Sequence, residues 1–425
     1  MREAPGLTRQ QAKTLTLSAL GGALEFYDFV IFVFFAGTMG ALFFPADMPG
    51  WLKLVQTFGI FAAGYLARPL GGIVMAHFGD LSGRKRMFML SILLMAIPTL
   101  LMGLLPTYAQ IGVLAPILLL LLRIMQGAAI GGEAPGAWVF VSEHVSPRHR
   151  TLACGALSAG LCAGILLGSL VARAINAHFT EAEVLAWAWR LPFIAGGVFG
   201  FVAMLLRRQL HETPVFAELR ERRALAAELP LKTVVRGHGG AVILTMLLTW
   251  LLTAAVVVVL LMMPTLLQGM GVSRADALAG NTLAIAATIL ANLVAGVLAD
   301  RFGKGPVLVA WSLLLGGAFW LFHAGALADA YSPALYMLAG AAVGLTALVP
   351  AIAVDGFPPA VRFSGLSFGY NVAYAIAGGL TPVLLSLAVR DNPAAPMQYI
   401  AAMAALGVGL GLYVALRRNR VPETA

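Results

Sequence analysis

The sequence predicts an all-α membrane protein with twelve transmembrane helices, arranged as two pseudo-symmetric bundles of six. Three observations support this fold class. The composition is too apolar for a soluble chain, apolar runs of membrane-spanning length recur throughout, and polar loops of the first half return in the second.

The composition points to lipid as the solvent of this chain. Of the 425 residues, 60% are hydrophobic and 11% are charged, and the mean hydropathy is +0.88. A soluble domain carries about 25% charged residues. Because so little charge cannot cover the surface of a soluble protein, we expect the chain to lie in a bilayer, where one helical span takes about 20 apolar residues.

Twelve apolar runs, separated by turn and charge signals, have lengths suited to membrane helices. In chain order they cover residues 15–44, 52–78, 87–106, 111–141, 152–177, 189–206, 240–267, 275–298, 306–327, 333–354, 364–389 and 396–416. The first run follows a basic start at Arg2, Arg9 and Lys13. It is too long for a signal-peptide core and lacks a small-residue cleavage site, so we expect a retained helix.

The net charge of +9 is explained by topology rather than by a nucleic acid partner. An even number of spans places both termini on one side, and that side collects most of the 28 lysines and arginines. Short basic loops remain cytoplasmic. We therefore expect a multi-pass inner (plasma) membrane protein with both termini cytoplasmic, monomeric in the lipid bilayer.

Cofactor and metal sites are not expected. The two cysteines, Cys154 and Cys162, lie within one span and have the spacing of neither a metal site nor a disulfide framework, so they are interpreted as packing residues.

The longest polar stretch divides the chain into three parts. We predict an N-terminal six-helix bundle at 1–206, a cytoplasmic linker at 207–236 and a C-terminal six-helix bundle at 237–425. Within the linker, ELRERRALAAEL could form an amphipathic helix; a solvated connection is the simpler interpretation.

Two pairs of loops repeat between the halves. HFGDLSGRKR (77–86) follows the second span and AGVLADRFGKG (295–305) follows the eighth. SEHVSPRHR (142–150) follows the fourth span and VDGFPPAVR (354–362) follows the tenth, with an acid, a proline and an arginine at the same spacing. Duplicated halves that rock about a central site are typical of secondary transporters.

These loops resemble those of the major facilitator superfamily. The signature Gly-x-x-x-Asp-Arg-x-Gly-Arg/Lys is nearly complete in AGVLADRFGKG, whereas the first half departs from it at Ala76 and Leu81. The resemblance implies the major facilitator fold and a cytoplasmic gate, in which the loop acid binds a neighbouring helix end in one state and releases it in another. The predicted gate residues are Asp80, Gly83, Arg84, Glu143, Arg150, Asp300, Arg301, Gly303, Asp355 and Arg362.

A narrower resemblance covers nearly the whole chain. EFYDF (25–29), ARPLGG (67–72), RIMQGAAIGGE (123–133), HETPVF (211–216) and VRFSGLSFGYN (361–371) are similar to segments of the metabolite:proton symporter family. That resemblance implies import of a small polar solute together with protons. The solutes of the family include organic acids and zwitterions such as proline and betaines.

Three carboxylates lie inside predicted spans. Glu25 lies about 18 Å along the first helix if that helix begins near Lys13, Asp28 shares its face, and Glu133 lies in the fourth span. An ionised acid at such depth costs about 2.5–3.5 kcal/mol. We predict that these acids exchange the coupling proton; a fixed ion pair that locks the helices is the alternative.

Solute-binding residues are predicted from buried charge and from hydroxyl and amide groups. Arg68 in the second span and Arg123 in the fourth offer a planar fork suited to a carboxylate, and Gln126 lies on the face of Arg123. A purely structural role for each arginine remains open. The remaining predicted solute contacts are Tyr27, Tyr370, Asn371 and Tyr374.

Together these features predict a proton-coupled symporter that imports a small polar organic solute by alternating access. The two buried arginines favour a carboxylate; a proline- or betaine-type zwitterion is the alternative, and a proton-antiport exporter is a further one. An enzyme is not expected, because the chain has no His-Glu-x-x-His sequence, no phosphate-binding loop and no Ser/His/Asp grouping.

Overall fold

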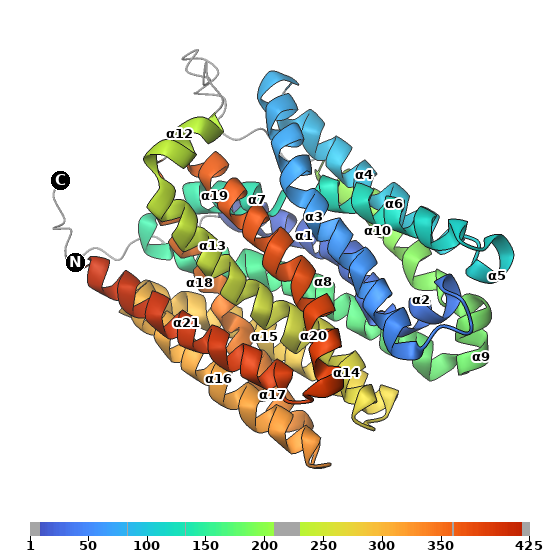
Figure 1. Cartoon of the computed structure of the whole chain (residues 1–425). Helices are drawn as coiled ribbons and strands as arrows, with labels where there is room; N and C mark the ends of the chain where they lie inside the picture. The colour runs from blue at the N-terminus through green and yellow to red at the C-terminus, as the bar shows by residue number, and fades with distance from the viewer. Residues whose placement is uncertain (1–8, 83, 132, 208–229, 359–360, 419–425) are drawn as a thin grey trace.

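The computed structural model describes residues 9–82, 84–131, 133–207, 230–358 and 361–418, and these are almost entirely helical (Figure 1). The first half comprises α1 (Arg9–Phe34), α2 (Ala36–Phe43), α3 (Gly50–Ser82), α4 (Arg84–Leu104), α5 (Tyr108–Ile111), α6 (Leu114–Ile130), α7 (Glu133–His144), η1 (Pro147–His149), α8 (Arg150–His178), α9 (Glu181–Glu183), η2 (Val184–Ala188) and α10 (Arg190–Arg207).

The second half follows the same order of long helices. It comprises α12 (Pro230–Gly237), α13 (Gly239–Ala254), η3 (Ala255–Met262), α14 (Met263–Gly269), α15 (Arg274–Phe302), α16 (Lys304–Leu327), α17 (Pro333–Ala342), η4 (Val343–Ala347), α18 (Leu348–Asp355), α19 (Arg362–Ala373), η5 (Tyr374–Gly378), α20 (Gly379–Asp391) and α21 (Ala395–Arg418). The short helix α12 lies in the range expected to be linker, whereas the predicted amphipathic segment at 218–229 lies outside the described residues.

The predicted fold class is confirmed. Within the described ranges, nine helices are long and apolar enough to cross a membrane, and a tenth span arises where Glu181–Ala188 and Arg190–Leu205 join at a bend of 47°. The remaining two predicted spans correspond to α3 and α4, of 33 and 21 residues. Several spans change helix type midway, with π-helical turns at η3 and η5.

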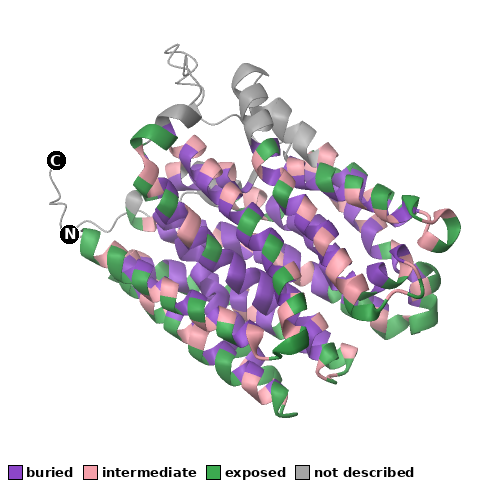
Figure 2. Cartoon of the chain, viewed as in Figure 1, coloured by how far each residue is buried: buried purple, intermediate pink, exposed green. Residues whose placement is uncertain are grey.

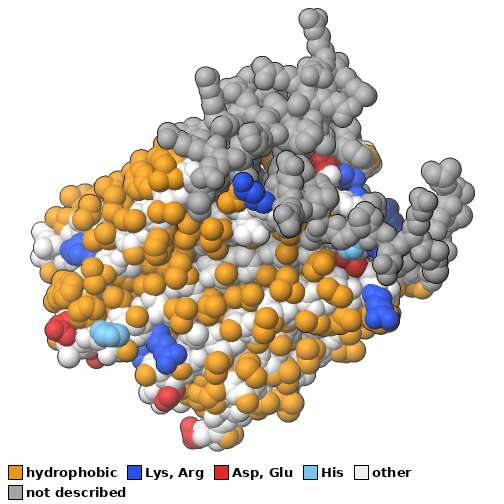
Figure 3. Space-filling model, turned by 180° about the vertical axis from the view of Figure 1, so that it is seen from behind, with side chains coloured by type: hydrophobic (Ala, Val, Ile, Leu, Met, Phe, Trp, Pro, Cys, Tyr) orange, Lys and Arg blue, Asp and Glu red, His pale blue; other side chains and the backbone are white. Residues whose placement is uncertain are grey.

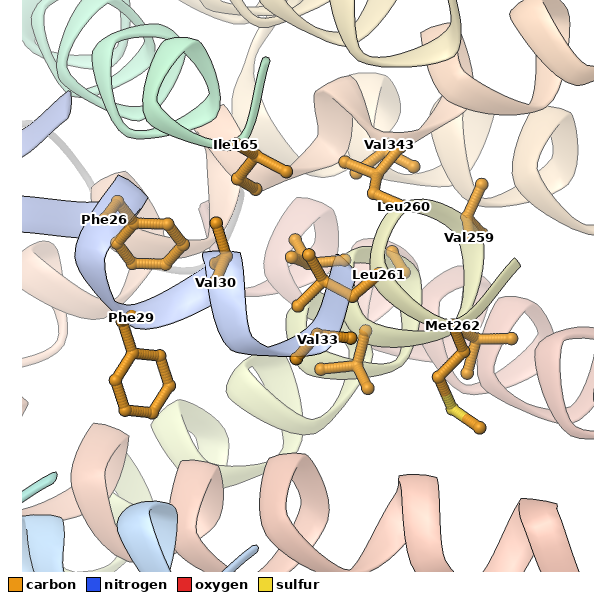
Figure 4. Close-up of a cluster of buried hydrophobic side chains, with 14 of the residues drawn as sticks. Phe26, Phe29, Val30, Val33, Ile165, Val259, Leu260, Leu261, Met262 and Val343 are labelled. Carbon is orange, nitrogen blue, oxygen red and sulfur yellow. The ribbon is translucent and has the colours of Figure 1, made fainter. Parts of the chain in front are cut away.

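The two halves pack against each other through pseudo-equivalent helices. α8, the fifth span, lies along α15, the eighth; α3, the second, lies along α20, the eleventh. Figure 1 shows the blue-to-green helices of the first half beside the yellow-to-red helices of the second. A third contact joins α1 to η3, where Val30 and Val33 meet Leu261 in an apolar cluster (Figure 4).

The outer surface is apolar between two polar ends. Buried residues fill the middle of the molecule in Figure 2, while large apolar side chains such as Leu70 and Leu290 are 70% and 65% exposed. In the face seen in Figure 3, charged side chains gather towards the two ends. An apolar belt around helices that satisfy their own backbone hydrogen bonds is what a bilayer requires.

Glycines bring α3 and α6 into backbone contact. A Cβ at Gly127 would lie 1.7 Å from the carbonyl oxygen of Gly64, and one at Gly131 would lie 2.1 Å from that of Arg68. Small residues permit such close helix approach in membranes. This contact fixes Arg68 beside the break between α6 and α7, at the centre of the molecule.

Candidate functional site

One end of the molecule carries the repeated loops 142–150, 295–305 and 354–362, and is called the basic end here. Two ion pairs cross between the halves at this end. Arg150 Nη1 lies 2.9 Å from Asp355 Oδ1, and Arg362 Nη1 lies 2.9 Å from Glu143 Oε1. The acid of each half therefore binds the arginine of the other half, and the two pairs join equivalent positions of the repeated loops.

Each of these arginines also holds its own loop. Arg150 Nε donates to the carbonyl oxygen of Ser142 at 3.3 Å, and Arg362 Nε donates to that of Val354 at 3.2 Å. Both bonds span eight residues, so the two loops are equivalent in structure as well as in sequence. The loops are thereby held in the geometry that aims each guanidinium at the opposite half.

Asp300 closes the same end by a different contact. Its Oδ1 accepts from the backbone N–H of Thr151 at 3.0 Å, and its Oδ2 accepts from that of Leu152 at 2.8 Å, both in the first turn of α8. An acid at a helix N-terminus is favourable because unpaired N–H groups and the helix dipole meet it there. Asp300 therefore ties α15 to α8 across the two halves.

The other residues of the second-half signature, Arg301, Gly303 and Lys304, have different surroundings. Gly303 ends α15 at a φ of +96°, a backbone conformation that favours glycine. Arg301 is exposed, with its guanidinium 5.4 Å from the ring of its neighbour Phe302. Lys304, which was not among the predicted gate residues, binds the carboxylate of Asp355 and donates to the carbonyl of Ala351 at 2.9 Å.

The first-half counterparts are described only in part. Asp80 lies in the last turns of α3 and Arg84 begins α4, but their side chains are outside the described part of the chain, and Gly83 is outside the described residues altogether.

A small cavity of about 30 Å³ lies between the halves. Helices of both halves contribute to its wall, which consists of Phe26, Trp138, Ser158, Leu161, Cys162, Ile165, Leu252, Val256, Thr346, Tyr370 and Tyr374. The sequence analysis identified Tyr370 and Tyr374 and missed the others. Apolar residues that line a cavity have the same pattern as those that pack a core. Phe26, which lies between the predicted residues Glu25 and Tyr27, and Trp138, five residues after Glu133, are wall residues close to a recognised signal.

Arg68 lies directly behind the tyrosines of this wall. It is fully buried, and its three guanidinium nitrogens have no hydrogen-bond partner among the described residues. Its Cζ lies 4.3 Å from the ring centroid of Tyr374, 5.5 Å from that of Tyr370 and 5.6 Å from that of Tyr65. Cation–π attraction to three rings thus holds a charge that no described carboxylate neutralises.

Arg123 is also buried but has internal partners. Its Nη1 donates to the carbonyl of Phe29 at 3.2 Å and to Oε1 of Gln126 at 2.8 Å, and Gln126 donates in turn to Thr99. Rings of Phe29, Phe32 and Phe61 surround its guanidinium. Neither Arg123 nor Gln126 belongs to the cavity wall.

Asp28 occupies a niche away from the cavity. It is 1% exposed, and neither carboxylate oxygen has a hydrogen-bond partner in the described parts of the chain. A Cβ at Gly196 would lie 2.7 Å from Asp28 Oδ1 and 2.8 Å from Cγ2 of Thr99, so the carboxyl fits against α10 only because glycine stands there. The niche therefore joins α1, α4 and α10 within the first half.

The other predicted residues fall into three groups. Tyr27 faces α10, where its hydroxyl donates to the carbonyl of Pro192 at 2.8 Å. Asn371 donates to the carbonyl of Gly131 and so joins the two halves at the break between α6 and α7. Glu25 and Glu133 lie on α1 and α7, and their side chains are outside the described part of the structure.

A polar seam joins the halves beside the cavity. Ser158 Oγ donates to the carbonyl of Thr346 at 3.2 Å, Thr346 Oγ1 donates to Asn292 Oδ1 at 2.8 Å, and Asn292 Nδ2 lies 3.6 Å from Cys162 Sγ. The hydroxyl protons of the two wall residues Ser158 and Thr346 are thus already used between α8, α15 and η4.

Comparison with known proteins gives consistent results. The family model described as Major Facilitator Superfamily matches residues 18–382. The chain is 31% identical over 423 residues to the "Glycine betaine/proline/ectoine/pipecolic acid transporter OusA" of Dickeya dadantii, covering 96% of this chain and 84% of that protein. It is 34% identical over 412 residues to the "Inner membrane metabolite transport protein YhjE" of Escherichia coli, covering 93% and 92%.

Solved structures show the same fold at lower identity. The proton:xylose symporter XylE bound to 6-bromo-6-deoxy-D-glucose superposes with a TM-score of 0.78 at 16% identity, over 96% of this chain and 95% of that one. A partially occluded inward-open conformation of XylE from E. coli gives 0.73, over 98% and 99%.

Proposed function

The chain belongs to the major facilitator superfamily, and on that premise we propose that this multi-pass membrane transporter imports a small zwitterion of the proline or betaine type. The transporter assignment excludes an enzyme. The organic carboxylate favoured in the sequence analysis is less well supported than the zwitterion alternative, because the relatives include proteins named for betaine and proline.

The observation that carries the carboxylate part of the solute proposal is the unpaired positive charge of Arg68 beside the cavity. Arg68 is a buried cation without a described hydrogen-bond partner, and none of the residues in the described cavity wall carries a carboxylate. A buried charge is costly until it is paired. The carboxylate of a zwitterion would pair with Arg68, while its positive nitrogen would face aromatic rings.

Other charge types fit this site less well. A dicarboxylate would bring one negative charge more than Arg68 can neutralise. A simple organic cation would enter beside Arg68 with nothing to offset the repulsion between the two. A zwitterion leaves the net charge of the site at +1 and a monocarboxylate makes it neutral, so the choice of the zwitterion over a monocarboxylate rests on the relatives named for betaine and proline.

The contacts at the basic end support alternating access. The Arg150–Asp355 and Glu143–Arg362 pairs and the Asp300 cap close this end, and a cavity of about 30 Å³ holds little more than one water molecule. The solute therefore needs the halves to separate before it can bind. We propose that these contacts form the gate, that the basic end faces the cytoplasm as its charge suggests, and that the protein acts as a monomer in the inner membrane.

Proton coupling is assigned to Asp28. A buried carboxyl with both oxygens unpaired is far more stable neutral than ionised. The proposed cycle protonates Asp28 in the closed form and releases the proton when α1 moves relative to α10. The niche lies within the first half, so solute and proton would occupy separate places and be coupled through α1.

A binding screen tests the solute proposal. The thermal unfolding of the purified protein would be followed with glycine betaine, proline, succinate, citrate and choline at equal concentration. Betaine and proline are expected to raise the unfolding temperature, because a ligand that binds only the folded state stabilises it. Stabilisation by succinate or citrate alone would refute the zwitterion and restore the carboxylate.

A further inference from the structure

The cavity wall distinguishes between kinds of positive nitrogen. We propose that the wall recognises a fully N-methylated onium group and disfavours ammonium groups that carry N–H, so that quaternary betaines are the preferred solutes. The inference rests on the proposed function and adds to it a ranking among zwitterions.

Aromatic faces provide the first part of the argument. Trp138 and Tyr370 lie edge to face with ring centroids 5.0 Å apart, and Tyr370 and Tyr374 follow at 5.1 Å. All three belong to the wall, as does Phe26. A quaternary ammonium binds such faces within about 6 Å of a centroid, and tryptophan is the strongest ring for it.

The rings are not equally available to a solute. Arg68 already lies over Tyr374 and within 5.6 Å of Tyr65 and Tyr370. Among the described residues, no arginine or lysine is placed over Trp138. Trp138, the wall ring over which no described cation is placed, is therefore the site assigned to the onium group, with Arg68 on the carboxylate side.

The hydrogen-bond inventory provides the second part. The wall contains neither a carboxylate nor a side-chain amide, and the carbonyl oxygen of Thr346 already accepts from Ser158; the acceptors that its side chains offer are neutral hydroxyl oxygens. The indole N–H of Trp138 is buried and has no partner among the described residues, so it adds a donor where an ammonium would need acceptors. A buried donor without an acceptor is unfavourable.

The two parts lead to the same ranking. A primary ammonium brings three N–H donors to a wall that offers hydroxyl oxygens but neither a carboxylate nor a side-chain amide, and each methyl that replaces an N–H removes one donor that needs a partner. The same methyl adds apolar surface for the rings to cover. The ion pair with Arg68 is the same for every member of such a series, because all members carry the same carboxylate.

The test is the affinity of the purified full-length protein for glycine, N-methylglycine, N,N-dimethylglycine and glycine betaine, measured by calorimetry. Affinity is expected to rise with each methyl, by about tenfold or more from the first to the last. A flat or falling series would overturn the inference while leaving the proposed function intact. Failure of the whole series to bind, with binding of another solute class, would overturn both.

Variants identify the ring that discriminates. Trp138→Phe keeps an aromatic face and is expected to preserve the ranking, whereas Trp138→Leu is expected to lower the betaine-to-glycine affinity ratio by about tenfold. Trp187→Leu is the matched control, because Trp187 is 46% exposed, contacts Phe179 and does not belong to the wall. An unchanged betaine-to-glycine affinity ratio in Trp138→Leu would overturn the assignment of Trp138. The ligand series on the wild-type protein tests the ranking even if a variant fails to fold.

Discussion

The pair between Glu143 and Arg362 offers a direct perturbation of the proposed gate. The two side chains are 20% and 13% exposed and lie 2.9 Å apart across the halves. An exposed pair contributes up to about 1 kcal/mol, while removing one partner of a fully buried pair costs about 3–5 kcal/mol. A partly buried pair lies between these limits, so we expect a coupling of about 1–2 kcal/mol, or roughly a 5–30-fold change in the population open at the basic end.

The two cysteines of the chain supply the assay. Cys154 is fully buried in the first turns of α8, four residues after the gate residue Arg150, and so it becomes reachable only when the basic end opens. In a Cys162→Ser background, the rate at which a water-soluble maleimide labels Cys154 reports that opening. We expect Glu143→Gln to raise this rate roughly 5–30-fold, and Arg362→Gln to raise it by at least as much, because Arg362 also holds Val354.

A double-mutant cycle isolates the pair from these additional bonds. The double variant should label less than the product of the two single effects predicts, since the same contact cannot be lost twice. Arg148→Gln is the control, being an exposed cation at the same end. Fully independent effects of the two single variants, or equal acceleration by the control, would refute the gate.

Three further predictions test the centre of the molecule. Arg68→Gln is expected to weaken zwitterion binding about a hundredfold by calorimetry while the protein stays folded, because the carboxylate loses its cation; equal affinity would remove Arg68 from the site. Gly127→Ala is expected to lower the free energy of unfolding by about 1–3 kcal/mol through overpacking against Gly64, whereas Gly59→Ala, with nothing within 4 Å of its Cβ, should not. Asp28→Asn is expected to keep solute counterflow and lose proton-driven accumulation; retention of both would exclude Asp28 from coupling.

The sequence was sufficient for the fold because bilayer physics constrains it strongly. Apolar length sets the spans, and the repeat sets the symmetry. The repeat also identified the four residues of the proposed gate, because Glu143 and Arg150 have the same spacing as Asp355 and Arg362. The structure joins each of these acids to the arginine of the other half. What the spacing left unstated is which acid meets which arginine, because that depends on how the halves dock.

The centre was harder to predict, because a polar residue within a span does not reveal which neighbour its side chain faces. Asp28 and Tyr27 both face α10 rather than the cavity. Arg68 and Arg123 looked alike in sequence, yet only Arg68 lies behind wall residues, while Arg123 is held by Phe29 and Gln126. The rotation of each helix about its axis decides which neighbour a side chain faces. That rotation is set by glycine contacts between helices, and a single sequence does not show which helix each glycine contacts.

We propose that an inward proton gradient drives a zwitterion through this protein. It is tested most directly in proteoliposomes with a defined interior, an acidic exterior and radiolabelled glycine betaine outside. We expect betaine to accumulate above its external concentration, and we expect this accumulation to be abolished by a protonophore and absent in liposomes without protein. Betaine uptake that only equilibrates and does not respond to the proton gradient, or betaine that the gradient drives outward, would refute proton-coupled import.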